Sequence, residues 1–344
     1  RCAGTTLDKD KLPLRVMNML TVSVSMWWHI LRAFRRGDVA LVVTNPPLLP
    51  FLVAMTCRLK GARCVLVMHD VYPDAIVAAG MLRPDSLITR VLNRLSRSLF
   101  ARVDGISVLG RDMQALVRRK LRRPDDPRVV VIPNWSDAIT PGPRESNPLL
   151  AELGLLDKFV VLYAGNIGLL QDIATLVAAA EILVTRDPQV HWLFIGWGAK
   201  SRWLEEAVKD SRLGNVTLLG PRPRNTQQTF LNACDVSISA MMPGMAGAGV
   251  PSRMYNVMAA GKPMIAATDD TSEQALLIRE ENIGWAVPTG RADLVVEAIL
   301  EAKGDPKRLA EMGHRARAAL EQKYTVGHAV GRYRQVIQRL AEVR

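Results

Sequence analysis

The sequence predicts an α/β protein built from two domains with parallel sheets that face a cleft. Short apolar runs of strand length alternate with helical stretches along most of the chain, which is typical of strand–helix–strand units. A Pro- and Gly-rich stretch at 136–148 interrupts this alternation, which then resumes. The length of 344 residues suits about two domains. A cleft between two such domains is the usual place for a ligand.

The first half of the chain predicts four buried parallel strands, because its apolar runs are short and do not alternate with polar residues. These strands are expected at 39–45, 62–70, 103–110 and 128–134. Helices are expected between them at 48–60, 86–101 and 110–122.

The apolar residues 16–31, before the first strand, are too short for a spanning helix and contain Ser, Thr and His. They predict either a buried helix or an interfacial one, with Trp27 and Trp28 at the level of lipid headgroups.

The second half repeats the pattern. Strands are expected at 158–165, 190–198, 215–220, 236–240, 262–267 and 284–288. Helices are expected at 172–187, where Asp172 is a suitable N-cap, at 201–211, and in the tail 305–344. We therefore place the first domain at 1–137, a linker at 138–148, the second domain at 149–322, and a final helix at 323–344 that packs back on the first domain.

The composition favours anionic partners, since the formal net charge is +12. Aromatic residues make up only 5% of the chain and no nucleic-acid-binding motif occurs, so we expect no nucleic-acid partner. Cys2, Cys57, Cys64 and Cys234 form no CxxC pair and have no metal-ligand spacing with histidine. They predict buried free thiols in a reducing cytoplasm, and no secretory signal is visible.

Two glycine-flanked helix starts in the second half predict a site for a diphosphate. In the first, Gly165, Asn166 and Gly168 follow a strand, where bare backbone can approach a ligand and a helix start supplies N–H donors. In the second, Pro251 fits a first helical turn, Ser252 can cap it, and Arg253 can bind an anion with two donors.

Both helix starts have a plainer interpretation as ordinary capped helices with a solvated arginine. The glycine-rich residues 243–249 precede the second start, and their amides could also face a ligand. Residues 196–200, "GWGAK", lack the third glycine of a dinucleotide fingerprint. Lys200 is therefore either a further phosphate contact or part of a solvated helix start.

The order of five segments resembles the nucleotide-binding half of family 4 GT-B glycosyltransferases: "YAGNIG", "FIGWGAK", "GNVTLLGPRP", "ACDVSISA" and "VPSRMYNVMAAGKPMIA". In the first half, "TNPPLLPFLVA", "VLVMHDVYPD" and "VVVIPNW" are similar to acceptor-side motifs of the bacterial surface-polysaccharide subgroup, the colanic-acid or O-antigen type. The resemblance covers roughly residues 38–335 and implies two Rossmann-like domains.

This resemblance implies a retaining transfer of a hexosyl or N-acetylhexosaminyl group from a nucleotide-diphosphate donor, with a UDP-sugar favoured. The acceptor would be a polyprenyl-diphosphate-linked sugar. No metal or other cofactor is expected, and the chain has no suitable Asp-x-Asp motif, because Asp8-Lys9-Asp10 lies in a polar tail. The leaving diphosphate must then be neutralised by helix starts and by Arg or Lys.

The site residues follow from this resemblance. Ala248, with Gly249 beside it, stands where many members have a glutamate that contacts the donor sugar, and Asn256 stands where they have one that contacts the ribose. Pro221 and Arg222 correspond to the nucleobase site. The basic pair common after the first glycine turn is absent, because Asn166, Leu170 and Gln171 occupy that loop.

His69 and Asp70 end a strand that faces the cleft. By resemblance, His69 hydrogen-bonds the donor sugar, and Asp70 is the candidate base for the acceptor hydroxyl. The alternatives are a capped strand end and an Asp that caps the next turn. Asn134 and Trp135 either line the cleft or pack at the domain edge.

The strand and glycine-rich loop that normally open the family are not found at the start of this sequence. We therefore expect an incomplete first domain, either because the sequence is a fragment or because the protein has lost them. A catalytically impaired nucleotide-sugar-binding or scaffold protein of the same fold is the alternative function, and an epimerase is a third.

Residues 83–123 interleave many Arg and Lys residues with apolar ones. They predict either docking on an anionic membrane or a solvated helix face. Docking would place the protein on the inner face of the plasma membrane, as a peripheral cytoplasmic protein.

Overall fold

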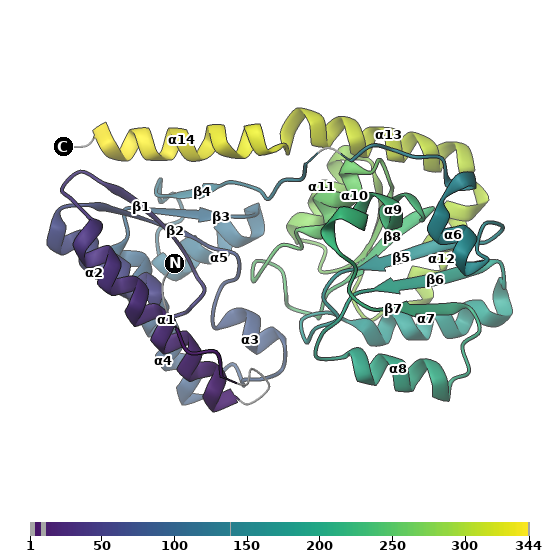
Figure 1. Ribbon diagram of the computed structural model, residues 1–344, viewed down its shortest axis with the longest axis horizontal. Coiled ribbons are helices and arrows are strands. Elements are labelled where there is room, and N and C mark those ends of the chain that lie inside the picture. The colour runs from purple at the N-terminus through teal and green to yellow at the C-terminus, as the bar shows by residue number, and fades with distance from the viewer. Residues whose placement is uncertain (1–3, 8–11, 138, 343–344) are drawn as a thin grey trace.

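The computed structural model describes residues 4–7, 12–137 and 139–342, and it forms two lobes side by side (Figure 1). Each lobe is built on a parallel sheet, as the alternating pattern predicts. Cys2 and the polar Asp8-Lys9-Asp10 segment lie outside the described residues.

The first lobe has a four-stranded sheet in the order β1-β2-β3-β4. Its strands are β1 (Val39–Val43), β2 (Arg63–Val67), β3 (Gly105–Val108) and β4 (Val129–Val131), all parallel. Its helices are α1 (Leu12–Ala33), α2 (Leu49–Lys60), α3 (Asp74–Ala78), α4 (Leu87–Arg102) and α5 (Arg111–Leu121). All four predicted strands are confirmed, and every residue of β3 is buried, as expected for a strand covered on both faces.

The stretch at 16–31 lies within α1 and is neither fully buried nor fully exposed. One side packs on α2, where the Trp27 indole donates to Thr56 Oγ1 at 3.0 Å and Ser23 is buried. The other side carries an apolar stripe of Met17, Leu20, Val24 and Trp28, each between 42% and 53% exposed. In the part of the chain that the structure describes, no helix combines the length and the apolar character needed to cross a membrane.

The second lobe has a six-stranded sheet in the order β10-β9-β8-β5-β6-β7. Its strands are β5 (Phe159–Ala164), β6 (Val190–Ile195), β7 (Val216–Leu219), β8 (Val236–Ala240), β9 (Met264–Ala267) and β10 (Gly284–Val287). Its helices are α6 (Pro148–Leu153), α7 (Ile173–Arg186), α8 (Ser201–Asp210), α9 (Gln227–Asn232), α10 (Arg253–Ala259), α11 (Glu273–Glu281), α12 (Ala292–Gly304) and α13 (Pro306–Lys323). The predicted N-cap is confirmed, since the Asp172 carboxylate accepts the Thr175 amide at 3.3 Å.

The last described helix lies on the first lobe. After α13, helix α14 (Val326–Glu342) runs across the sheet of the first lobe (Figure 1). Val336 and Leu340 of α14 pack against Val65 and Ile132 in one small buried cluster. The final helix therefore packs on the first lobe through its own core contacts, while the chain connects it to α13 of the second lobe.

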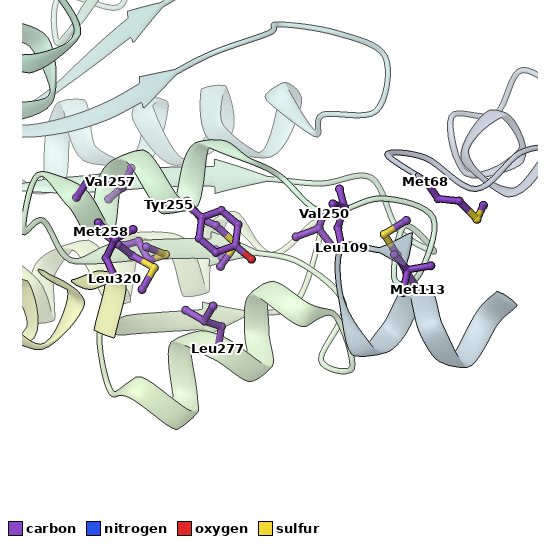
Figure 2. Packing of buried hydrophobic residues seen from close by; sticks show 14 of the residues in the cluster. Met68, Leu109, Met113, Val250, Tyr255, Val257, Met258, Leu277 and Leu320 are labelled. Atoms are coloured by element: carbon purple, nitrogen blue, oxygen red, sulfur yellow. The ribbon is translucent and has the colours of Figure 1, made fainter. Parts of the chain in front are cut away.

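A larger apolar cluster joins the lobes at the cleft. Met68, Leu109 and Met113 of the first lobe belong to the same cluster as Val250 and Tyr255 of the second (Figure 2). Because burying such side chains is favourable by about 25 cal/mol per Å² of apolar surface, this cluster favours the closed arrangement of the lobes.

The predicted thiols Cys57, Cys64 and Cys234 are buried and unpaired. Burial raises the pKa of the Cys234 thiol to about 12, so it stays neutral. The described residues contain no cluster of three or more His, Cys, Asp or Glu side chains arranged to hold a metal ion.

Candidate active site

A cavity of about 660 Å³ opens between the lobes, within the size range of small-molecule sites. It lies where strands β5 and β6 end and where α10 begins. The lining residues are Asp70 from the first lobe and, from the second, Ala164–Asn166, Leu170, Gln171, Ile195–Trp197, Pro221, Arg222, Gln227, Phe230, Leu231, Met241, Met245, Gly249–Arg253, Asn256 and Val257. The cavity thus brings together both predicted glycine-flanked turns.

Arg253 is one of two arginines in this described lining, and residues of the cavity wall hold its guanidinium. Its guanidinium carbon lies 4.7 Å from the ring centroid of Tyr163, and its Nη2 donates to the Asn166 carbonyl at 3.5 Å. A Cβ at Gly165 would lie only 2.9 Å from the guanidinium carbon, so the glycine makes room for the arginine. Buried Nη1 has no hydrogen-bond partner among the described residues. A buried donor without an acceptor is costly, so the protein leaves part of the hydrogen-bonding capacity of Arg253 unused.

The turn at 165–168 uses most of its amides internally, contrary to the sequence expectation of several unpaired donors. Gly165 donates its amide to the Ile195 carbonyl, Ile167 donates to the Trp197 carbonyl, and Gly168 donates to Gln171 Oε1. Asn166, which is exposed at the cavity, is the residue of this turn positioned to meet a ligand. The neighbouring strand end supplies the competing carbonyls, and sequence alone does not reveal that pairing.

The glycines of "GWGAK" serve packing. A Cβ at Gly196 would lie 1.9 Å from the Gly165 carbonyl oxygen, and one at Gly198 would lie 2.4 Å from the Ile167 carbonyl oxygen. These glycines let two loops pack backbone on backbone, which agrees with the rejection of a dinucleotide fingerprint.

Four predicted site residues, His69, Gly168, Lys200 and Ala248, are not among the described residues that line the cavity. The Lys200 ammonium donates to the Gln171 carbonyl at 2.8 Å and contacts the Met242 sulfur at 3.9 Å. It is therefore already bonded within the protein, and Arg253 is left as the more suitable cation. Ala248 is fully buried beneath Gly249.

The second helix start differs from its sequence prediction. Helix α10 begins at Arg253 and has only seven residues, so Pro251 precedes it. Ser252 lines the cavity, but within the described part of the chain its side chain makes no capping hydrogen bond.

Several amides of the preceding loop, which could have faced a ligand, are bonded within the protein instead. Gly244 and Ala246 donate to the Asp269 carboxylate, and Gly247 donates to Asp112 Oδ2 at 2.9 Å. Two carboxylates, one from each lobe, therefore hold residues 243–249 in place.

Asp70 brings the first lobe to the cavity. It forms an antiparallel bridge with Gly249, and Val71 donates its amide to the Ala248 carbonyl at 2.8 Å. A Cβ at Gly249 would lie 2.9 Å from Asp70 Oδ1, so this contact needs a glycine.

Burial raises the pKa of the Asp70 carboxyl, although His69 lowers it somewhat. His69 itself is exposed. Raised basicity is what a proton acceptor near neutral pH requires.

Asn256 of α10 faces the cavity, and its Oδ1 accepts a hydrogen bond from Ser136 Oγ at 2.8 Å. Pro221 and Arg222 also line the cavity, at its exposed rim. Sequence reasoning missed Tyr163, Ser136 and Trp197. A tyrosine just before a glycine turn is only a weak sign that its ring will lie beneath an arginine. The surroundings of Ser136 and Trp197 depend on the fold and cannot be read from the sequence.

Comparisons with known proteins agree with this architecture. Residues 150–319 match the family described as "Glycosyl transferases group 1", and residues 7–135 match a "Glycosyl transferase 4-like domain". The chain is 34% identical over 294 residues to the probable glycosyltransferase WbjE of Pseudomonas aeruginosa, covering 85% of this chain and 72% of that protein. It is 25% identical over 260 residues to WcaI of Escherichia coli K12, named for colanic acid biosynthesis, covering 74% of this chain and 63% of that protein.

Solved structures share the fold. HepE of Anabaena, crystallised in complex with UDP, aligns with a TM-score of 0.75 at 17% identity over 94% of this chain and 84% of that one. Sucrose-phosphate synthase of Thermosynechococcus elongatus aligns with a TM-score of 0.78 at 18% identity over 99% of this chain and 82% of that one. The predicted GT-B fold is thereby confirmed. Together with the identity to WbjE, the two family matches establish that this chain belongs to the group 1 glycosyl transferases and is a glycosyltransferase.

Proposed function

We propose that this glycosyltransferase moves a hexosyl or N-acetylhexosaminyl group from a UDP-sugar to a polyprenyl-diphosphate-linked acceptor in surface-polysaccharide biosynthesis. The relative WbjE is named as a glycosyltransferase, and the name of WcaI, which refers to colanic acid biosynthesis, supports this type of pathway. HepE, which shares the fold, has been crystallised with UDP and with UDP-glucose. The observation that carries the proposal is the position of Arg253, which lines the cavity with its guanidinium held by the Tyr163 ring and the Asn166 carbonyl.

In this proposal Arg253, the start of α10 at Ser252, and Asn166 bind the diphosphate. Pro221 and Arg222 hold the base, with the exposed ring of Trp197 beside them in the same lining. Gly249 and Asn256 face the donor sugar and ribose. Asp70 accepts the proton of the acceptor hydroxyl, and transfer proceeds with retention at the anomeric carbon.

The donor set supports a reaction without a metal ion. Of the residues lining this cavity in the described part of the chain, Asp70 alone is acidic, whereas Arg222 and Arg253 are both basic. Arg253 supplies the positive charge that stabilises the leaving diphosphate. A preorganised donor of this kind typically contributes about a hundredfold or more in rate.

Transfer of radiolabelled sugar to a polyprenyl-diphosphate-linked acceptor tests this function. With a panel of UDP-sugars, we expect label to enter the lipid fraction at the same rate with and without EDTA. Stabilisation by UDP without any transfer would instead support the alternative of a nucleotide-sugar-binding protein. If EDTA abolished transfer and added Mg²⁺ restored it, the reaction would depend on a metal ion and this part of the proposal would be contradicted.

We further propose that the first lobe docks on anionic lipid through α4. The docking surface is then a smaller part of the stretch 83–123 that the sequence predicts. Within that stretch Arg111 pairs with Glu273 and Glu280 of the other lobe, and Lys120 is buried against Asp74 at 2.7 Å. Helix α4 instead exposes an apolar stripe, which consists of Leu87, Ile88, Val91 and Leu95. Its arginines are Arg90, Arg94, Arg97 and Arg102, and all four are exposed.

Flotation with anionic liposomes checks this docking. Each basic residue near the headgroups is worth about 1 kcal/mol, so the double charge reversal Arg90→Glu/Arg94→Glu is expected to weaken binding by at least about tenfold. Parent binding should fall at high salt. Arg202→Glu, an exposed arginine on α8, serves as the matched control and should leave binding unchanged. The proposal would be contradicted if binding of the parent did not depend on salt concentration. It would also be contradicted if the Arg90→Glu/Arg94→Glu variant floated to the same extent as Arg202→Glu.

A further inference from the structure

The first turns of α5 and α11 meet across the two lobes. The Arg111 amide donates to Glu273 Oε2 at 2.7 Å, and its guanidinium binds both oxygens of the same carboxylate at 3.0 and 3.1 Å. The remaining guanidinium nitrogen, Nη1, donates to Glu280 Oε1 at 2.6 Å. One arginine of the first lobe therefore engages two glutamates of the second. Hydrogen bonds to these carboxylates raise the pKa of Arg111, so it is charged at every accessible pH.

The contact is reciprocal. Asp112 Oδ2 accepts the Glu273 amide at 3.1 Å and the Gly247 amide at 2.9 Å. Each lobe thus places a carboxylate at the first turn of a helix in the other lobe, where the helix dipole favours negative charge. The backbones approach closely: a Cβ at Gly110 would lie 2.7 Å from Glu273 Cβ, and one at Gly247, whose φ is +80°, would lie 2.9 Å from the Asp112 carbonyl oxygen.

This contact reaches the cavity through one loop. Gly247, which Asp112 holds, lies two residues before Gly249 and directly before Ala248, and both of these are tied to the strand end at Asp70 and Val71. The same loop carries Met245, Gly249 and Val250 into the cavity lining. A change at Asp112 or Arg111 is therefore transmitted directly to the wall of the site.

We propose that Arg111, Asp112 and Glu273 form an interlobe latch that holds the lobes closed and positions the loop 243–249 for sugar transfer. These are positioning residues, because Arg111, Asp112 and Glu273 lie outside the described cavity lining. The part of the proposal that concerns donor binding rests on the proposed function, whereas the part that concerns closure does not.

The latch depends on the free-energy cost of keeping the Glu273 carboxylate buried. Glu273 is only 5% exposed, so its carboxylate has lost most of its contact with water. Such a charge is tolerated while its partner remains and becomes strongly unfavourable when the partner is removed. Without the Arg111 guanidinium, the lobes can relieve this by separating, which rehydrates Glu273. The equilibrium between closed and open forms then shifts toward the open one.

Arg111→Ala and Arg111→Lys test the latch, with Arg202→Ala as the matched control. The Arg111 side chain is 43% exposed, which favours folding of both variants. Arg202 pairs with Glu206 on the surface of α8, away from the interface, so its loss removes a surface ion pair only. Small-angle X-ray scattering reports closure, and titration with UDP reports donor binding.

For Arg111→Ala we expect a larger radius of gyration and about a tenfold rise in the Kd for UDP and in the KM for the donor, with a smaller change in kcat. Arg111→Lys keeps the charge but loses the bidentate contact, so it should fall between the alanine variant and the parent. If the scattering curve of Arg111→Ala superimposed on the curves of the parent and of Arg202→Ala, the latch proposal would be overturned. If the parent fails to bind UDP while Arg111→Ala still expands, the donor site is wrong and the latch stands.

Discussion

Replacing Arg253 with alanine is expected to abolish the thermal stabilisation that UDP gives the parent and to lower kcat/KM about 100- to 1,000-fold. The reason is geometric. Tyr163, Gly165 and the Asn166 carbonyl fix the guanidinium in the cavity wall, so its donors are already oriented before an anion arrives. Charge-assisted, bidentate hydrogen bonds of this kind are the strong ones, and alanine removes them all.

Two comparisons make this result specific to the site. Arg253→Lys retains a positive charge but not the planar fork, and it should recover only part of the UDP-induced shift. Arg202→Ala, a surface change on α8, should behave like the parent. An Arg253→Ala protein whose melting temperature still rises with UDP as the parent's does would place the diphosphate elsewhere.

Replacing Asp70 with asparagine should lower kcat by about 10²- to 10⁴-fold, the usual contribution of a general base, while UDP binding stays near the parent value. Asparagine keeps the size of the side chain and leaves the backbone bridge to Gly249 intact. Because Asp70 is the acidic residue of the described cavity lining, no neighbouring carboxylate there can take over its role.

The pH dependence of this reaction follows from the same burial. A base must be ionised to accept a proton, and burial raises the pKa of Asp70. The parent's kcat should therefore rise with pH through that raised pKa, and this limb should vanish in Asp70→Asn. Since the raised pKa means that ionising Asp70 disfavours the folded state, the asparagine variant should melt no lower than the parent. Asp85→Asn, an exposed acid of the same lobe, serves as the control.

A kcat that falls by the same factor in Asp70→Asn and Asp85→Asn would contradict the assignment. The assignment would also be contradicted if kcat of Asp70→Asn still rose with pH on the acidic side, as kcat of the parent does.

The strands were predictable because buried parallel strands leave a strong mark on sequence. Every apolar run named as a strand contains one in the structure, from β1 at Val39–Val43 to β10 at Gly284–Val287. Helix α1 could not be resolved in the same way. Its composition suits both burial and an interface, and only packing on α2 separates the buried side from the exposed stripe of Met17, Leu20, Val24 and Trp28.

The site was harder to predict because it depends on hydrogen bonds between distant segments. Gly165 and Ile167 look like free donors in sequence, yet the end of β6 takes both amides. Lys200 looks like a phosphate ligand, yet the Gln171 carbonyl takes its ammonium. Arg111 and Glu273 are 162 positions apart, so their contact exists only once both lobes have formed. Arg253 could be singled out because its Pro-Ser-Arg setting follows a glycine-rich loop in the second domain, and the structure places it in the cavity lining.

In the proposed function, the second lobe binds a pyrophosphate with Arg253 and backbone donors in place of a metal ion. A crystal structure of the protein with UDP, grown with Mn²⁺ present so that anomalous scattering would mark a bound metal, tests this mode of binding. We predict the β-phosphate of UDP on the Arg253 guanidinium and beside Ser252, with no anomalous peak at the diphosphate. A nucleotide bound outside this cavity, or a manganese peak bridging its phosphates, would contradict the account.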